Sequence, residues 1–420
     1  MVGIQANLRT YLKHFQTGFK VGTFDQSGNA FEYLRGLLKG QTGKRNIEKI
    51  SQQQINNNYQ RLHHFISDSN WDSDHVSDIV HKINKELLTG KSYGYIIDER
   101  SQAKKGLHSV GVGRQYCGST GKIDNCQTGV YSVLTTPSMT LPSSFRLFLP
   151  QEWINDRNRC KRAKLPSGIS SKTKVDLAIE MIKRDRQNGI NPLWYGGDSL
   201  YGRAWRLTNF IEVDCCSHFV MDTSKDHQIY LTNPLSDPKA KAITIDDYLH
   251  AINLSKQSVV KYEGSKKAFV HLVDVFTKHT KCDRNRAPKR VLIISKGLAK
   301  NDKIKYSLTN FTTQQKTAAE LVYMQRARFT VEQYFREANQ VAGMGDYQVR
   351  SYQAWKHTQI LSMMLMQLIN IVRRAILKKK ANLPLITIVN CVSTILWRVP
   401  NYRTLAINII RQYRQALNSS

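Results

Sequence analysis

Three acidic residues lie far apart in the sequence, and each stands where a carboxylate could take part in chemistry. Asp98 ends the apolar run 95–97, so a buried strand there would carry it to the edge of a sheet. Asp198 follows the apolar run 193–195 and two glycines, which we interpret as letting the backbone approach a phosphate or a metal closely. Glu332 lies in a helical stretch. Three carboxylates held rigidly can bind two divalent cations, so together they predict metal-dependent phosphoryl transfer.

The two aspartates also have ordinary structural interpretations. Asp98 could be a turn residue that ends a strand, and Asp198 could belong to a Gly-Asp loop. Glu99 is a weaker candidate than Asp98, because neighbouring residues of a strand point to opposite faces of the sheet.

The helical stretch 326–339 leaves a similar alternative open. Arg328, Glu332 and Arg336 are spaced four residues apart and share a helix face. Such Arg–Glu–Arg ladders are common on solvated surfaces and contribute little stability. Glu337 is a rival acid on a neighbouring face of the same helix.

The composition predicts a polyanionic partner. The 420 residues include 62 Lys and Arg against 32 Asp and Glu, a formal charge of +30. Nucleic acid is the commonest partner for such a charge, although a membrane surface or ribosomal RNA would explain the charge equally well. The longest apolar runs, near 358–372 and 383–397, are shorter than the roughly 20 residues of a membrane span. With no secretory signal visible, we expect a soluble cytoplasmic protein that is not associated with a membrane.

Cysteine usage points to no disulfide framework. The seven cysteines form no CxxC pair. A structural zinc ion on His108, Cys117 and Cys126 is a weak alternative, because these spacings match no standard zinc finger.

The patterning along the chain predicts an α/β protein with helical regions at both ends. Residues 1–90 read as helices, either a plain bundle or a DNA-end-binding domain. Residues 91–223 read as three strands, a helix and two strands, an order that fits a mixed sheet led by a β-meander. Residues 224–310 are β-rich, residues 311–350 carry the Glu332 helix, and residues 351–420 are helical and basic. The five cations within 373–380 could be a solvated helix face or a DNA contact.

Four segments carry a resemblance to a known family. Residues 58–76, 93–130, 194–202 and 328–358 resemble the DDE transposases of bacterial insertion sequences, in the branch with a β-rich insertion before the catalytic Glu. The likeness covers about residues 25–370. It implies a ribonuclease H-like mixed sheet core with that insertion, flanked by N-terminal and C-terminal helical regions.

The resemblance also implies the site and its cofactor. Asp98, Asp198 and Glu332 match the three acids that hold two Mg²⁺ ions, for which Mn²⁺ can substitute. The family signature on the Glu helix has Tyr, Arg, Glu and Lys at fixed steps, and Arg328 matches its Arg. Here Gln325 stands in place of the Tyr and Asn339 in place of the Lys, so a terminal-phosphate contact from those two positions is in doubt.

The activity implied is cleavage and strand transfer at the ends of an insertion sequence. Water attacks a phosphodiester, and the freed 3′-hydroxyl attacks target DNA in line, with no protein nucleophile. The partners implied are double-stranded DNA, as terminal inverted repeats and as target, and a second copy of the chain in a paired-end complex. A nuclease or resolvase that does not transpose, and a non-catalytic DNA-binding descendant of a transposase, remain alternatives.

We expect basic residues near the acids to contact DNA. The candidates are Lys104, Lys105, His108, Arg114, Arg203, Arg328 and Arg336. Aromatic residues near Asp198 could either stack on a flipped base or pack in the core, and core packing is the better-supported interpretation; they are Trp194, Tyr195 and Tyr201.

Overall fold

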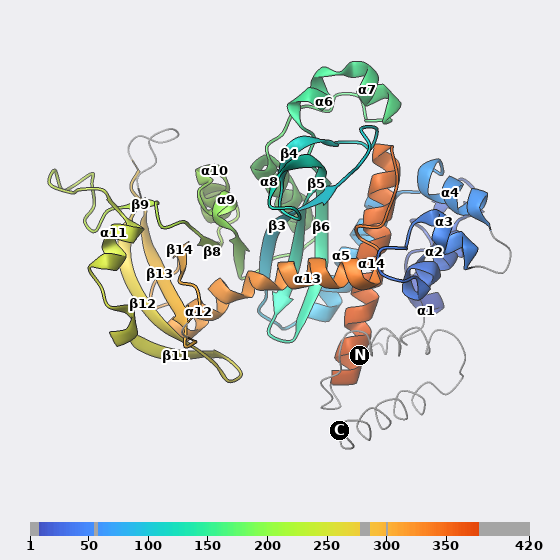
Figure 1. Ribbon diagram of the computed structural model, residues 1–420. Helices are drawn as coiled ribbons and strands as arrows, with labels where there is room; N and C mark the ends of the chain where they lie inside the picture. Colours follow the sequence, from blue (N-terminus) through green and yellow to red (C-terminus); the bar gives the residue numbers. More distant parts are fainter. Residues whose placement is uncertain (1–7, 54–57, 278–285, 300, 378–420) are drawn as a thin grey trace.

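The computed structural model describes residues 8–53, 58–277, 286–299 and 301–377, and its centre is a ten-stranded mixed sheet. Five strands run in the spatial order β6-β5-β3-β7-β8 (Figure 1). β3 pairs antiparallel with β5 and parallel with β7, and β7 pairs parallel with β8. This arrangement confirms the expected ribonuclease H-like α/β core. These strands are β3 (Gly94–Ala103), β5 (Lys122–Thr136), β6 (Met139–Leu147), β7 (Trp194–Gly197) and β8 (His218–Asp222).

The β-rich segment after β8 continues the same sheet. Its strands follow in the order β8-β14-β13-β12-β11, each antiparallel to its neighbour, and they form the arm on the left of Figure 1. A small apolar cluster that includes Ile229, Ile245 and Leu292 packs within this arm. Its elements are β9 (Gln228–Ile229), β10 (Ile243–Thr244), α11 (Ile245–His250), η2 (Leu254–Lys256), β11 (Ser258–Glu263), β12 (Lys266–Phe276), β13 (Lys289–Gly297) and β14 (Lys305–Thr309).

Alternation along β3 distributes its side chains between two helical layers. Tyr95 and Ile97 join the apolar cluster under α8 (Lys174–Gln187), whereas Ile96 joins the cluster on the other face. On that other face α13 (Phe329–Val341) crosses the sheet from α12 (Ala318–Ala327) toward α14 (Tyr352–Leu377) (Figure 1). Asp98, two residues after Ile96, therefore faces α13.

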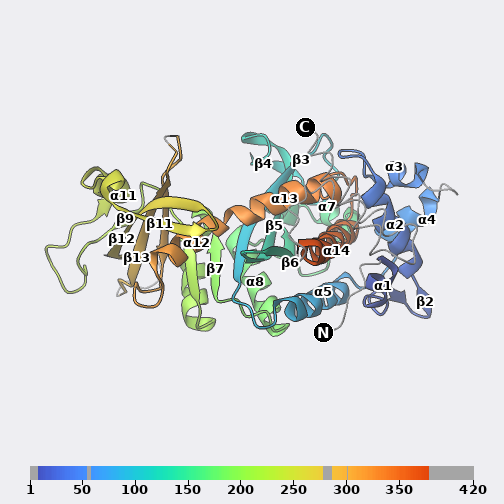
Figure 2. The same ribbon diagram turned by 90° about the horizontal axis from the view of Figure 1, so that it is seen from below.

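The N-terminal helices share one hydrophobic core with the sheet. α14 lies between β6 on one side and α2 and α4 on the other, whereas α5 contacts both α14 and β6 (Figure 2). The α14 side chains from Ile360 to Leu368 are buried. One apolar cluster runs from Leu8 to Val372. The N-terminal elements are α1 (Leu8–Lys13), β1 (Lys20–Val21), β2 (Phe24–Asp25), α2 (Ser27–Lys39), α3 (Ile47–Gln52), α4 (Tyr59–Ser67) and α5 (Ser73–Leu88).

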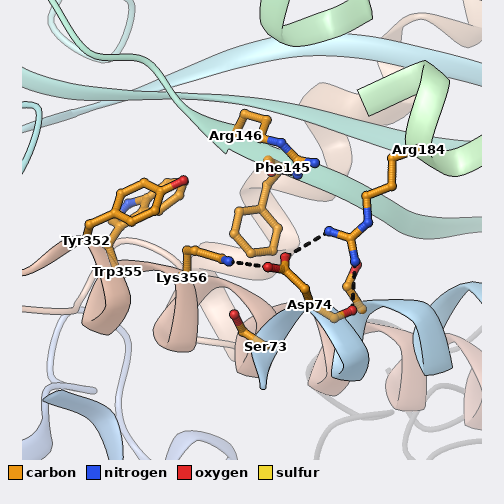
Figure 3. Close-up of a pocket in the computed structure, with 9 residues that line it drawn as sticks. Ser73, Asp74, Phe145, Arg146, Arg184, Tyr352, Trp355 and Lys356 are labelled. Atoms are coloured by element: carbon orange, nitrogen blue, oxygen red, sulfur yellow. Dashed lines mark hydrogen bonds and ion pairs between the residues drawn. The ribbon is translucent and has the colours of Figure 1, made fainter. Parts of the chain in front are cut away.

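An ion-pair network joins α5 to the core at the end of a cavity of about 180 Å³. Asp74 accepts from Lys356 Nζ at 2.7 Å and from Arg184 Nη1 at 2.8 Å, so it bridges α14 and α8 (Figure 3). Burial favours the neutral form of Asp74, but the two cations outweigh it and lower its pKa to about 2. Asp72 caps α5 by accepting hydrogen bonds from two backbone amides.

Short elements complete the described chain. They are β4 (Gly113–Cys117), α6 (Gln151–Asn155), α7 (Arg157–Arg162), α9 (Ser199–Gly202), α10 (Trp205–Asn209) and η1 (Phe210–Asp214). Within the described ranges no helix is long and apolar enough to cross a membrane. The basic cluster 373–380 falls partly outside the described residues, and the apolar run 383–397 falls wholly outside them.

Candidate active site

The three predicted acids line one cavity of about 640 Å³. Ile97 of β3 lies opposite Gly197 of β7 in a parallel pair. The next residues along the two strands are Asp98 and Asp198, so both aspartates emerge at the same edge of the sheet. Glu332 reaches the cavity from the first turn of α13.

Two further acids border the cavity. Asp222 ends β8, whose Met221 lies opposite Gly197, so Asp222 extends the row of strand-end carboxylates. Asp222 was not among the predicted site residues, although it ends an apolar strand just as Asp98 does. Glu99 points toward the α8 side as expected, where it accepts from Lys174 Nζ at 2.7 Å and from the Tyr201 hydroxyl at 3.1 Å.

Arg328 lies among these carboxylates. Its guanidinium pairs with Asp222 at 2.8 Å, with Glu332 at 2.5 Å and with Asp98 at 3.5 Å. The Arg–Glu spacing on the helix is therefore part of a network that ties α13 to two strands of the core, and Arg328 is the cation that balances the cavity's acids.

The aspartates resist ionisation in this setting. Burial is the main cause that raises the pKa of Asp98 to about 7; repulsion by Asp198 adds to it and Arg328 opposes it. Burial, followed by repulsion from Glu99, likewise raises the pKa of Asp198. Negative charge is therefore in excess at this edge of the sheet, and a bound cation would relieve it.

The carboxylates at this cavity are suitable ligands for a divalent cation, but their present spacing is too wide to hold one. Carboxylate oxygens are the ligands that Mg²⁺ prefers. In the described part of the chain, however, no three His, Cys, Asp or Glu side chains are grouped closely enough to hold a metal ion as they stand. Arg328 contacts Asp98 and Glu332 instead, so metal binding at these acids requires them to move closer to one another and away from that guanidinium.

Three of the basic residues predicted to contact DNA have exposed side chains. Lys105 and His108 lie in the loop after β3, and Arg114 lies on β4. Within the described residues the Arg114 guanidinium forms no ion pair.

The other predicted contacts have partners inside the protein. Lys104 donates to the Tyr347 carbonyl at 3.1 Å and lies over its ring, and burial lowers its pKa to about 8. Arg203 pairs with Asp226 at 2.5 Å, and Arg336 is exposed over the Phe329 ring. DNA contact by these residues stays a prediction.

The aromatic residues near Asp198 pack in the core. Trp194, Tyr195 and Tyr201 are at most 2 % exposed, so the core interpretation is confirmed. The exposed aromatic residue at the cavity is Tyr116 of β4, which is 62 % exposed and lies opposite Ile123 of β5, itself 63 % exposed. Because successive side chains of a strand point to opposite faces, the register of this hairpin could have identified Tyr116 and Ile123 as neighbours on one face.

The two glycines before Asp198 lie where packing is tight. A Cβ on Gly196 would lie 2.7 Å from the Trp194 ring and 2.8 Å from Ile96, and one on Gly197 would lie 3.0 Å from the Tyr201 Cβ. Packing alone therefore accounts for both glycines, and a close approach of a phosphate or metal to this backbone stays a prediction.

The two departures from the family signature have different surroundings. Gln325 is buried and donates to the Ile293 carbonyl at 3.1 Å and to Ser307 Oγ at 3.0 Å. Asn339 lines the active-site cavity, and its Oδ1 accepts from Arg100 Nη2 at 2.7 Å.

Comparison with known proteins identifies the family. A family described as "DDE superfamily endonuclease" matches residues 15–243, more than half of the chain and a segment that holds Asp98 and Asp198. The chain is 31 % identical over 190 residues to the "Probable transposase for insertion sequence element IS701" of Microchaete diplosiphon. That match spans 45 % of this chain and 46 % of the relative, about half the length of each. Together with the strand order and the row of strand-end acids, the family match places this chain in the DDE superfamily of endonucleases.

Proposed function

We propose that this chain is the transposase of an insertion sequence, which cuts phosphodiester bonds at the ends of its element and transfers the freed strands to target DNA. The observation that carries the proposal is the cavity lined by Asp98, Asp198 and Glu332, which come from two adjacent strand ends and a helix. The family match and the named relative support the same activity.

Asp98, Asp198 and Glu332 are the residues that would hold Mg²⁺. Two such ions, when bound, activate the attacking oxygen and stabilise the leaving oxygen of an in-line displacement. Before a metal binds, Arg328 neutralises part of the charge of these acids. At least one of its ion pairs, with Glu332 or with Asp98, must break before that carboxylate can become a metal ligand. Asp222 remains as its partner at 2.8 Å, so Arg328 keeps one anchor and its charge stays beside the scissile phosphate.

The β4–β5 hairpin would hold the DNA beside the cavity. Arg114, Tyr116 and Ile123 share one face of this hairpin, because Tyr116 lies opposite Ile123 and Arg114 lies two residues before Tyr116. An exposed ring next to an unpaired guanidinium suits a nucleic-acid strand, since a base can stack on the ring while a phosphate pairs with the cation. The resemblance further implies that two copies act together on paired element ends.

Cleavage of end DNA tests the proposal. The substrate is labelled duplex DNA that flanks the gene, incubated with the full chain and Mg²⁺ or with EDTA. We expect Mg²⁺-dependent nicking by the wild type and none by Asp98→Asn, Asp198→Asn or Glu332→Gln, each with end binding largely retained. Glu337→Gln is the matched control, because Glu337 lies on the same helix but pairs with Arg373 at 3.1 Å. An acid variant that cuts at the wild-type rate removes that residue from the site.

Strand transfer separates transposition from simple cleavage. Precut ends are mixed with a target plasmid, and joined products are counted. Joining supports a transposase, cutting without joining supports a nuclease of the same fold, and end binding without any cutting supports a non-catalytic descendant.

A further inference from the structure

Arg100 lines the active-site cavity, although no local sequence pattern distinguishes it from other arginines. It follows Asp98 by two residues on β3, so the two side chains share a face of the sheet, and both line the cavity. Arg100 Nη2 donates to Asn339 Oδ1 at 2.7 Å and to Gln102 Oε1 at 2.7 Å.

Neutral acceptors orient this guanidinium without cancelling its charge. The other cavity cation, Arg328, pairs with three carboxylates. Among the described residues Arg100 has no carboxylate partner, and both of its recorded hydrogen bonds leave from Nη2. The N–H groups of Nε and Nη1 are thus available to an anion, and a guanidinium presents them in the fork that matches a phosphate.

The cluster formed by Arg100, Gln102 and Asn339 is enclosed by α13 and by the loop that follows it. Asn339 lies on α13 seven residues, about two turns, after Glu332, so it faces the same cavity. Gly345, in the loop after α13, closes over the cluster: a Cβ there would lie 2.7 Å from Arg100 Nη2 and 2.8 Å from Gln102 Oε1. Only glycine lets the loop pass without displacing the guanidinium.

We propose that Arg100, oriented by Asn339 and Gln102, binds a phosphate of the DNA strand that enters the active-site cavity. Position 339 is where the family signature has a Lys, and this chain places an Asn there. In this chain Arg100 on β3 supplies the positive charge instead of a residue on α13, and Asn339 orients the Arg100 guanidinium through a hydrogen bond. The inference rests on the proposed function, since it assigns a binding contact to the same cavity.

The test measures cleavage of end DNA by the full chain with Mg²⁺. Arg100→Gln should slow cleavage about ten- to hundredfold, the effect expected for a lost charged hydrogen bond. Arg100→Gln combined with Asn339→Lys returns the cation to α13 and should recover most of that loss. Arg206→Gln, an exposed Arg paired with Asp176 away from the cavity, is the matched control and should change the rate less than about twofold.

Neutral methylphosphonate linkages, placed singly along the substrate, identify the phosphate. One position should slow the wild type about tenfold or more and have little further effect on Arg100→Gln, because the contact is already lost. Gly345→Ala should reproduce this pattern by pushing the guanidinium aside, which provides a second variant if Arg100→Gln does not fold.

The outcomes separate the two proposals. If the wild type cleaves and Arg100→Gln cleaves within about twofold of it, the Arg100 assignment is overturned and the proposed function stands. The assignment is also overturned if Arg100→Gln is slow but Asn339→Lys gives no recovery and every methylphosphonate effect adds to the variant's defect. If the wild type does not cleave any end DNA, the proposed function itself fails.

Discussion

Charge balance among a few residues dominates the physics of the active-site cavity. Asp98 and Asp198 follow paired strands whose residues are buried. Burial raises the pKa of both carboxyls, and repulsion by Asp198 raises that of Asp98 further. Arg328 offsets part of this effect from the start of α13. A protein that keeps such an unfavourable cluster gives up stability for function, as is common where carboxylates serve as ligands.

Removal of one acid should therefore stabilise the protein when no metal is bound. Folded Asp98 keeps its proton up to about pH 7, whereas the unfolded chain loses it near its ordinary value of about 4. This group's contribution to the unfolding free energy thus falls as pH rises from about 4 to about 7. In EDTA at pH 8 we expect Asp98→Asn to melt a few degrees above the wild type, with the difference shrinking toward pH 4.

Thermal melts across that pH range check this expectation, with Glu337→Gln as the control. An Asp98→Asn variant that melts below the wild type at pH 8 would mean that the Asp98–Arg328 pair outweighs the burial of the carboxylate.

The elements of the core were largely predictable from the sequence, because their patterns are local. The strand at 94–103, the 122–136 hairpin arm and the helix at 174–187 all follow from alternation or helical periodicity. Asp98, Asp198 and Glu332 were found because strand ends and the family resemblance identify them. The pairing of Arg328 with Asp98 and the support of Arg100 by Asn339 depend on contacts between residues more than 200 positions apart, which no local pattern reports.

The ion pairs that join α5 to α8 and α14 make a contribution to stability that depends on pH. Asp74 is about half exposed, at 53 %, so its ion pairs with Lys356 and Arg184 are partly screened. We expect Asp74→Asn to lower the unfolding free energy by about 0.5–1 kcal/mol at pH 7. The folded pKa of about 2 lies below the unfolded value, so this stabilisation is present above about pH 4 and is lost as pH falls toward 2.

Denaturant titrations at pH 7 and pH 3 measure this difference. Asp68→Asn, which removes exposed pairs with Lys164 and with His63, is the control and should cost less. An equal loss of stability for Asp74→Asn at both pH values would show that the side chain acts through packing instead of charge.

The β4–β5 hairpin should act as a unit at the cavity rim. Tyr116→Ala should weaken cleavage of end DNA about five- to hundredfold, the range expected for one stacked base. Tyr116→Phe keeps the ring and should remain near the wild-type rate. Leu235→Ala, an exposed apolar residue of the β-rich arm, is the control for general surface effects. Cleavage by Tyr116→Ala at the Tyr116→Phe rate would remove the ring from the proposed contact.

At the scale of the whole molecule, the net charge of +30 acts on a chain whose N-terminal helices and core share one packed interior. We expect end binding to weaken steeply with salt, because each Lys or Arg on a phosphate releases condensed counterions. For six to ten contacts the affinity should fall roughly 10³- to 10⁵-fold between 50 and 200 mM salt. Fluorescence anisotropy over that range measures the slope, and a flat response would exclude an interface dominated by phosphates.

The most direct test of the account maps where a divalent ion binds. Fe²⁺ can replace Mg²⁺ at oxygen sites, and with ascorbate and peroxide it cuts the polypeptide next to the bound ion. We predict cuts near residues 98, 198 and 332 in one molecule, suppressed by excess Mg²⁺ and abolished together by Asp98→Asn. Cuts near only one of these residues, or cuts elsewhere that Mg²⁺ does not suppress, would contradict a single metal site built from the three acids.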